Sequence, residues 1–171
     1  MIEEGAKAPS FSLESDSGET VDLASFAGSW LVLYFYPKDD TPGCTREAQA
    51  FSEAMGQLKK VGAQVVGVSK DSAKSHCGFR DKYALKFPLL SDPELRTQKA
   101  FGAYGEKTMY GKKTMGTIRS TFIIDPKGKI AKVFSNVKVD GHAEAVLVAL
   151  KALVTRSAHV DAKSLSVRNV D

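Results

Sequence analysis

A cysteine at the start of an expected helix is the feature of this sequence best suited to chemistry. Cys44 follows Thr41, Pro42 and Gly43 at the end of the segment PKDDTPGC (residues 37–44), which comes directly after the apolar run of residues 31–36. The Thr41 hydroxyl can cap a helix by accepting from a first-turn amide, and Pro42 suits the first helical position, where a missing N–H costs nothing. Cys44 then lies in the first turn, where unpaired amides and the helix dipole favour an anion. We expect a partly ionised, nucleophilic thiol there, although a free cysteine elsewhere is more often an inert core residue.

Hydrophobic patterning defines the elements that must position Cys44. Residues 31–36 are too apolar for a half-exposed strand, which predicts a central strand covered on both faces. After Cys44, apolar residues at helical spacing predict a helix to about Lys60, ended by Gly62. The remaining expectations are a hairpin around residues 11–23, strands over 63–69, 87–90, 118–124 and 130–134, helices over 72–86, 93–102 and 142–154, and a loop over 103–116.

This order of elements predicts the fold class. Alternating strands and helices, followed by a hairpin and a helix, indicate an α/β thioredoxin-like fold, with a central mixed β-sheet flanked by helices and an N-terminal β-hairpin. Right-handed crossovers place the Cys44 helix at the carboxyl end of a strand, where sites of open α/β sheets lie. We predict one domain over residues 1–155 and a flexible or loosely docked tail over residues 156–171.

Composition limits the classes of function. The chain has 171 residues, 43% hydrophobic residues and a net charge of +4, with scattered basic residues that do not predict a nucleic-acid surface. It has neither an apolar leader nor an apolar run of ~20 residues, so we expect a cytoplasmic protein without a membrane span. The two cysteines form neither a C-x-x-C motif nor a zinc pattern, and no metal is expected. In a reducing compartment such cysteines are more often catalytic than structural.

The motif around Cys44 resembles that of a known enzyme family. Pro37, Thr41 and Cys44 match the P-x-x-x-T-x-x-C motif of peroxiredoxins, and YFYPKDDTPGCTREA is similar to the bacterioferritin-comigratory, or peroxiredoxin Q, branch. The similarity covers roughly residues 3–154 and includes SKD, FPLLSD, FGAYGEK and IRSTFIID. It implies a thiol-dependent peroxidase for hydrogen peroxide and organic hydroperoxides, monomeric and without a cofactor, that is recycled by thioredoxin or a similar thiol reductant.

The resemblance also implies roles for individual residues. Cys44 would attack the peroxide and become a sulfenic acid, while Pro37 shields the thiolate from water. Thr41 would hydrogen-bond the thiolate or the peroxide oxygen. The backbone amides of Gly43 and Cys44 would donate to the bound oxygen.

Arg119 is the charged residue that most needs an explanation. It lies in the otherwise apolar segment 118–125, where burial without a partner is costly, so it either points to water at a strand end or is paired. The resemblance implies that it faces Cys44 and stabilises the thiolate and the departing oxygen. Glu47, one helical turn beyond Cys44, is either a surface carboxylate or a bidentate partner for Arg119.

The position of the second cysteine differs from the common pattern of the family. Many members carry a resolving cysteine five residues after the nucleophile, where this chain has Gln49. The only other cysteine is Cys77, whereas the alternative resolving position of the family matches Arg80, one helical turn further on. Cys77 therefore either resolves Cys44 through a disulfide or is a packing residue in a one-cysteine enzyme reduced by an external thiol. A thioredoxin-type oxidoreductase, disfavoured by the absence of C-x-x-C, and a redox-inert scaffold are the alternatives from other classes.

Overall fold

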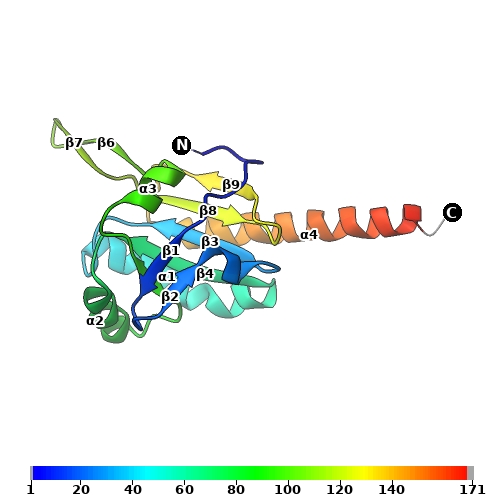
Figure 1. Cartoon of the computed structure of the whole chain (residues 1–171), viewed down its shortest axis with the longest axis horizontal. Helices are drawn as coiled ribbons and strands as arrows, with labels where there is room; N and C mark the ends of the chain where they lie inside the picture. Colours follow the sequence, from blue (N-terminus) through cyan, green and yellow to red (C-terminus); the bar gives the residue numbers. More distant parts are fainter. Residues whose placement is uncertain (1, 169–171) are drawn as a thin grey trace.

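A mixed β-sheet flanked by helices forms the body of the molecule in the computed structural model, which describes residues 2–168 (Figure 1). Its seven strands run in the order β2-β1-β5-β4-β3-β8-β9, and β6 and β7 pair separately. The strands are β1 (Ser12–Ser15), β2 (Thr20–Asp22), β3 (Trp30–Phe35), β4 (Ala63–Ser69), β5 (Leu89–Ser91), β6 (Tyr104–Met109), β7 (Lys112–Thr117), β8 (Ser120–Ile124) and β9 (Ile130–Phe134). The helices are the 3₁₀ turn η1 (Leu23–Phe26), α1 (Pro42–Lys60), α2 (Ala73–Tyr83), α3 (Arg96–Phe101) and α4 (His142–Arg168).

Strand β3 is the centre of the sheet. It pairs in parallel with β4 and antiparallel with β8, and all six of its residues are buried. Because successive side chains of a strand point to opposite faces, Val32 and Tyr34 join one core cluster, whereas Leu33 and Phe35 join the other. The expected central strand and the expected mixed sheet are both present.

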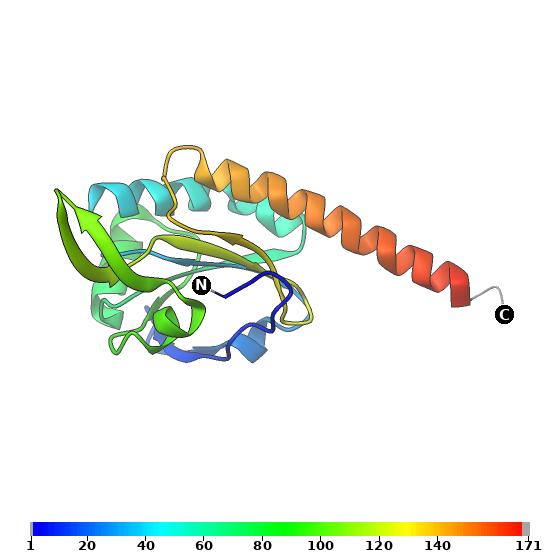
Figure 2. The same ribbon diagram turned by 90° about the horizontal axis from the view of Figure 1, so that it is seen from above.

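Helices α1 and α4 cover one face of the sheet and pack against each other (Figure 2). The buried stripe of α1 consists of residues at helical spacing, which the sequence analysis identified, and it includes Phe51, Met55 and Leu58. The helix ends where Gly62 takes a positive φ of 82°, a conformation that costs glycine little. The first turn of α1, with Cys44, is thereby held on the sheet at the end of β3.

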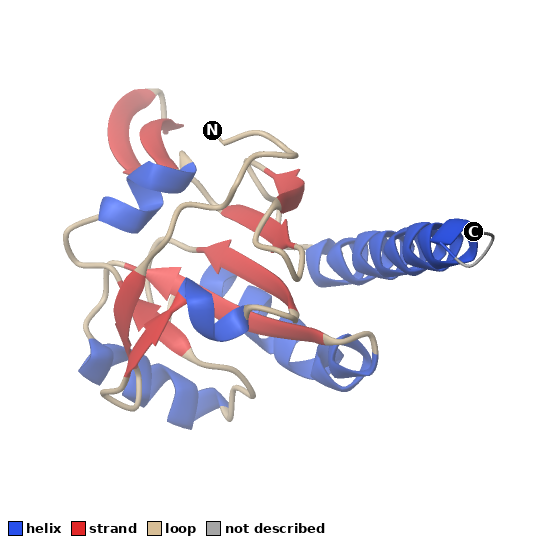
Figure 3. Cartoon of the chain, turned by 45° about the vertical axis from the view of Figure 1, so that its right-hand side comes forward, coloured by secondary structure: helices blue, strands red, loops and turns tan. Residues whose placement is uncertain are grey.

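The predicted loop over residues 103–116 is wrong. These residues form the β6–β7 hairpin, which stands apart from the main sheet (Figure 3). The turn residues Tyr110 and Gly111 both have positive φ, as a two-residue hairpin turn requires. The segment escaped prediction because β7 is mostly exposed and neither strand has the alternation of apolar and polar residues that identifies a half-buried strand.

Helix α4 is longer than predicted. It was expected to end near residue 154 but runs to Arg168, so that its second half projects beyond the sheet (Figures 1 and 2). The core-facing pattern ends after Val154, because the side chains of residues 155–159 are exposed or only half-buried. Residues 169–171 of the predicted tail lie outside the described residues, and the loose docking of residues 156–168 stays a prediction. No helix within residues 2–168 has the length and apolar character needed to cross a membrane.

A substitution at Gly67 tests the packing of the central strands. A Cβ at this position would lie 2.9 Å from atoms of the Tyr34 ring and 2.9 Å from Leu89 Cδ2, all of them in the core. We expect Gly67→Ala to lower the free energy of unfolding by about 1–3 kcal/mol, the usual cost of overpacking. Gly56→Ala, in the middle of α1 with nothing within 4 Å, should instead stabilise by about 0.5–1 kcal/mol. Urea unfolding measures both, and equal stability of the two variants would contradict the packing described for Tyr34.

Candidate active site

Cys44 lies in the first turn of α1, directly after the loop of residues 36–41 that follows β3. Its side chain is buried, with only 2% of the residue exposed, and it belongs to the core cluster on the α1 side of the sheet. The first backbone bond of the helix runs from the amide of Thr45 to the carbonyl of Thr41, at 2.8 Å. The amides of Gly43 and Cys44 precede that bond and are therefore free to donate to a ligand.

Thr41 occupies the N-cap position, but its predicted capping bond is wrong. The hydroxyl donates to the carbonyl oxygen of Lys38, at 2.9 Å, and makes no capping bond to the described helix. The positive φ of Asp40 (56°) curls the loop so that this carbonyl comes within reach. The hydroxyl oxygen can therefore still accept a hydrogen bond, and the first-turn amides remain available to donate hydrogen bonds to a bound molecule.

Arg119 connects Cys44 with Glu47. One terminal nitrogen, Nη2, lies 3.3 Å from Cys44 Sγ, and the other, Nη1, donates to Glu47 Oε1 at 2.6 Å. The Arg119 side chain is 17% exposed and that of Glu47 1%. Arg119 immediately precedes β8, the antiparallel neighbour of β3, and this pairing brings it across to the start of α1.

The predicted pairing of Arg119 with Glu47 is present, but the bidentate geometry is not. The second carboxylate oxygen of Glu47, Oε2, has no hydrogen-bond partner among the described residues. The guanidinium divides its two terminal nitrogens between the sulfur and the carboxylate, and therefore only one of them faces Glu47. A cation shared in this way favours the anionic form of the sulfur while Glu47 holds the cation in place.

Burial controls the charge of Glu47. It raises the pKa of Glu47 from its ordinary 4.5 to about 7, although the Arg119 cation and its hydrogen bond pull in the other direction. For Arg119, burial opposes the charge, but the neighbouring Glu47 and Cys44 raise the pKa, so the guanidinium stays charged. The net charge around Cys44 therefore changes near neutral pH through Glu47.

Lys107 is a residue near the site that the sequence analysis missed. Its stem crosses Gly116 on the neighbouring strand, where a Cβ would lie 3.3 Å from Lys107 Cδ. Burial and the Arg119 cation lower the pKa of Lys107, and the Cys44 anion partly opposes this. Lys107 thus brings a second cation within electrostatic range of the thiol. It was missed because β6 was expected to be part of a loop.

His142 lies behind the site and was also missed. Its Nε2 is 2.7 Å from the hydroxyl of Thr121 on β8, and its ring meets Phe51 and Phe134 edge to face. Burial, with a smaller contribution from Arg119, lowers the pKa of His142 from 6.5 to about 4, so this histidine is neutral at pH 7. It therefore adds no positive charge beside Arg119.

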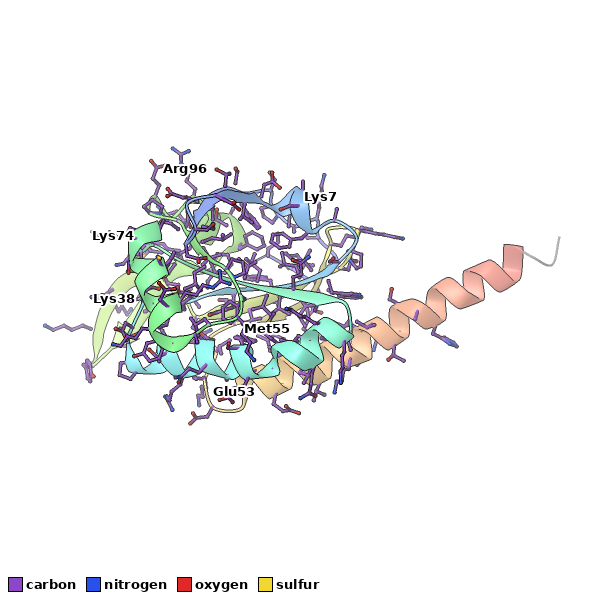
Figure 4. The ribbon with its side chains drawn as sticks, turned by 90° about the horizontal axis from the view of Figure 1, so that it is seen from below. Lys7, Lys38, Glu53, Met55, Lys74 and Arg96 are labelled. Carbon is purple, nitrogen blue, oxygen red and sulfur yellow. The ribbon has the colours of Figure 1, made fainter. Side chains whose placement is uncertain are left out.

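Within residues 2–168, Pro37 and Cys77 make no hydrogen bond or ion pair with Cys44, Arg119 or Glu47. Pro37 is half-buried at the end of β3. Cys77 is exposed on α2, with its sulfur 3.8 Å from Asp81 Oδ2, and both cysteines are free. Figure 4 shows Lys38, in the loop before α1, and Lys74, on α2, at the same edge of the molecule. The loop and α2 are joined there by the hydrogen bonds of Asp39 with His76 and of Asp40 with Lys82.

Three side chains near Cys77 have the types of atom that bind metals. The carboxylates of Asp39 and Asp71 and the ring of His76 offer ligand atoms within 4.8 Å of one another. Each of these atoms is already engaged in protein hydrogen bonds: Asp39 with His76, and Asp71 with Ser69 and the Asp39 amide. We therefore interpret the cluster as a hydrogen-bond network.

Comparison with known proteins agrees with this geometry. The AhpC/TSA family pattern matches residues 5–133. A putative peroxiredoxin Bcp of Coxiella burnetii is 49% identical over 146 residues, covering 85% of this chain and 97% of that protein. Peroxiredoxin Bcp of Escherichia coli is 42% identical over 150 residues, covering 88% of this chain and 96% of the relative.

Solved structures of similar proteins support the same assignment. The bacterioferritin comigratory protein of Xanthomonas campestris, studied for alkyl peroxide reduction, matches with a TM-score of 0.81 and 46% identity over 84% of this chain and 92% of that one. A cysteine-to-serine mutant of PrxQ from Xylella fastidiosa matches with a TM-score of 0.84 and 41% identity over 89% and 97%. The chain belongs to the AhpC/TSA family, as a thioredoxin-like peroxiredoxin of the Bcp, or PrxQ, type.

The pKa of Glu47 generates a prediction for the pH dependence of Cys44 oxidation. As the pH rises through about 7, Glu47 becomes negative and offsets the Arg119 charge that favours the thiolate. Glu47→Gln keeps an acceptor oxygen for Arg119 but cannot ionise. We divide the single-turnover rate of the wild type with hydrogen peroxide by that of the variant, and we expect this ratio to decrease as the pH is raised from about 6 to about 8. Rapid quenching and mass spectrometry measure both rates, and a ratio that does not change with pH would contradict the titration of Glu47.

Proposed function

We propose that Cys44 is the peroxide-reducing nucleophile of this peroxiredoxin and that hydrogen peroxide and organic hydroperoxides are its substrates. The observation that carries the proposal is the 3.3 Å contact between Arg119 Nη2 and Cys44 Sγ at the start of α1. An anionic sulfur is the reactive form of a cysteine, and a half-buried cation beside a helix N-terminus favours that form.

The first step is a displacement at oxygen. The Cys44 thiolate attacks the nearer oxygen of the hydroperoxide, so that an S–O bond forms and the O–O bond breaks. The departing alkoxide is stabilised by Arg119 and by the free amides of Gly43 and Cys44, and it leaves as alcohol or water after taking a proton. The sulfur is oxidised to a sulfenic acid. In this proposal Pro37 and the hydroxyl of Thr41 line the approach to the sulfur.

The second step regenerates the thiol. Cys77 attacks the sulfenic acid, a Cys44–Cys77 disulfide forms and water leaves; thioredoxin or a similar dithiol then reduces the disulfide. Both sulfurs belong to one chain, so a monomer suffices, and the reductant indicates a cytoplasmic location. Because Cys44 is buried on α1 and Cys77 is exposed on α2, we infer that part of the site opens before the disulfide forms.

Replacement of each cysteine separates the two steps. Cys44→Ser should abolish peroxide consumption with the fold intact, because the two side chains are close in size. Cys77→Ser should oxidise once at nearly the wild-type rate, since Cys77 takes no part in the attack, and should then accumulate sulfenic and sulfinic acid at Cys44. Its turnover with thioredoxin should be lost.

The readouts are stopped-flow peroxide consumption, thioredoxin-coupled turnover and peptide mass. Retained turnover in Cys44→Ser would overturn the assignment of the nucleophile. Thioredoxin-coupled turnover of Cys77→Ser at the wild-type rate would instead favour the one-cysteine mechanism, with Cys77 as a packing residue. Reduction of insulin by the wild-type protein would favour a thioredoxin-type oxidoreductase.

A further inference from the structure

The departing oxygen of the proposed reaction must take up a proton, and the side chains nearest to Cys44 are poor donors. The Arg119 guanidinium stays charged in proteins and does not release a proton. The hydroxyl proton of Thr41 is already donated, at 2.9 Å, to a backbone carbonyl of its own loop. His142 is neutral at pH 7, because its pKa lies at about 4, and therefore has no readily released proton.

Glu47 can carry a proton near neutral pH, but its place in the site does not suit donation to the substrate. Arg119 offers Nη1 to Glu47 and Nη2 to the sulfur of Cys44, so the guanidinium lies between the carboxylate and the reacting atom. The Glu47 side chain is also only 1% exposed, so water has little access to return a proton after each turnover. A donor in contact with water meets both requirements better.

Lys107, on the β6–β7 hairpin, has such contact because its side chain is only half-buried. Its backbone pairs with Thr114, and paired residues share one face of a ribbon. Its stem does not stay beside Thr114, because Lys107 Cδ lies 3.3 Å from the place of a Cβ on Gly116, two residues nearer the base of the hairpin. The side chain therefore runs down this face toward the base.

The base of the hairpin adjoins the site. The amide of Ile118 donates to the carbonyl of Ala103 at 2.7 Å, which closes the hairpin one residue before Arg119. Burial lowers the pKa of Lys107, the Arg119 cation lowers it further and the Cys44 anion opposes them, so the ammonium lies within electrostatic range of both residues. The hairpin and the start of α1 stand at the same end of the molecule (Figures 1 and 2).

No counter-charge holds the Lys107 ammonium. Within residues 2–168 it has neither an ion pair nor a hydrogen bond, whereas its neighbour Glu106, on the opposite face of the ribbon, pairs with Lys113 at 3.6 Å. A cation that is kept beside another cation without a partner gives up its proton more easily than an ordinary lysine. This placement suits a proton donor better than a residue that stabilises the fold.

We propose that Lys107 is a catalytic residue of the peroxide step: its ammonium donates the proton that the departing oxygen takes up. The inference rests on the proposed function, in which Cys44 attacks the hydroperoxide. As the S–O bond forms, the electron pair of the O–O bond moves to the departing oxygen, which takes the proton of Lys107 and leaves as alcohol or water. The neutral amine then regains a proton from the solvent. Arg119 stabilises the charge that develops on the oxygen during this transfer.

Lys107→Arg tests the proposal, because it keeps the positive charge but cannot give up a proton. With tert-butyl hydroperoxide, whose departing alkoxide is strongly basic, the single-turnover rate of Cys44 oxidation should fall by about 10²-fold. With peracetic acid, whose departing acetate needs no proton, the rate should stay within about threefold of wild type. Rapid quenching and peptide mass analysis measure both rates, and thermal unfolding shows whether the variant is folded at the assay temperature.

Two further variants separate proton donation from charge. Lys107→Met should lose at least as much rate with tert-butyl hydroperoxide as Lys107→Arg does. Lys113→Met is the matched control, because it removes a lysine of the same hairpin from the opposite face, where the side chain is 77% exposed. Its rates with both oxidants should stay within about twofold of wild type.

The proposal is overturned if Lys107→Arg keeps the wild-type rate with tert-butyl hydroperoxide, because charge alone would then suffice. It is also overturned if Lys107→Arg slows both oxidants equally, or if Lys113→Met slows the reaction with tert-butyl hydroperoxide as much as Lys107→Met does. A wild-type protein in which neither oxidant modifies Cys44 would instead refute the assignment of the nucleophile, and this inference with it.

Discussion

The Arg119 guanidinium, shared between the sulfur of Cys44 and the carboxylate of Glu47, is the interaction on which the site depends. Its nitrogens lie 3.3 Å from the sulfur and 2.6 Å from the carboxylate. The half-buried guanidinium has a counter-charge in Glu47, whose side chain is almost completely removed from water. Because burial also raises the pKa of Glu47 to about 7, the carboxylate compensates the cation only in part at neutral pH. The remaining positive charge acts on the sulfur.

The sheet brings three chain segments of the proposed site to one end of the molecule. Strand β3 delivers the loop and first turn with Cys44, β8 begins directly after Arg119, and β4 leads toward α2 with Cys77. The same loop carries Asp39 and Asp40, which attach it to α2. In the proposed mechanism, peroxide reduction at Cys44 and thiol exchange with Cys77 therefore both involve one short connection between β3 and α1.

Much of this arrangement could be predicted from the sequence. The apolar run before Pro37 identified the central strand, and the Thr41–Cys44 spacing identified the helix start. The hydroxyl bond of Thr41 could not be predicted, because it depends on the path of the loop at Asp40. Nor could the pairing of Asp39 with His76, since hydrogen bonds between residues 37 positions apart leave no periodic signal. The β6–β7 hairpin escaped because pairing, rather than burial, holds it.

The most direct test of the central claim is the rate of Cys44 oxidation in Arg119→Met. We would mix reduced protein with one equivalent of hydrogen peroxide, quench at millisecond intervals and follow the modified Cys44 peptide by mass spectrometry. Loss of a cation that favours the thiolate and stabilises the leaving oxygen should slow this step by roughly 10²-fold. Arg46→Met, which removes an exposed arginine on α1 paired with Asp140, should leave it nearly unchanged. An unaltered rate in Arg119→Met would contradict the account.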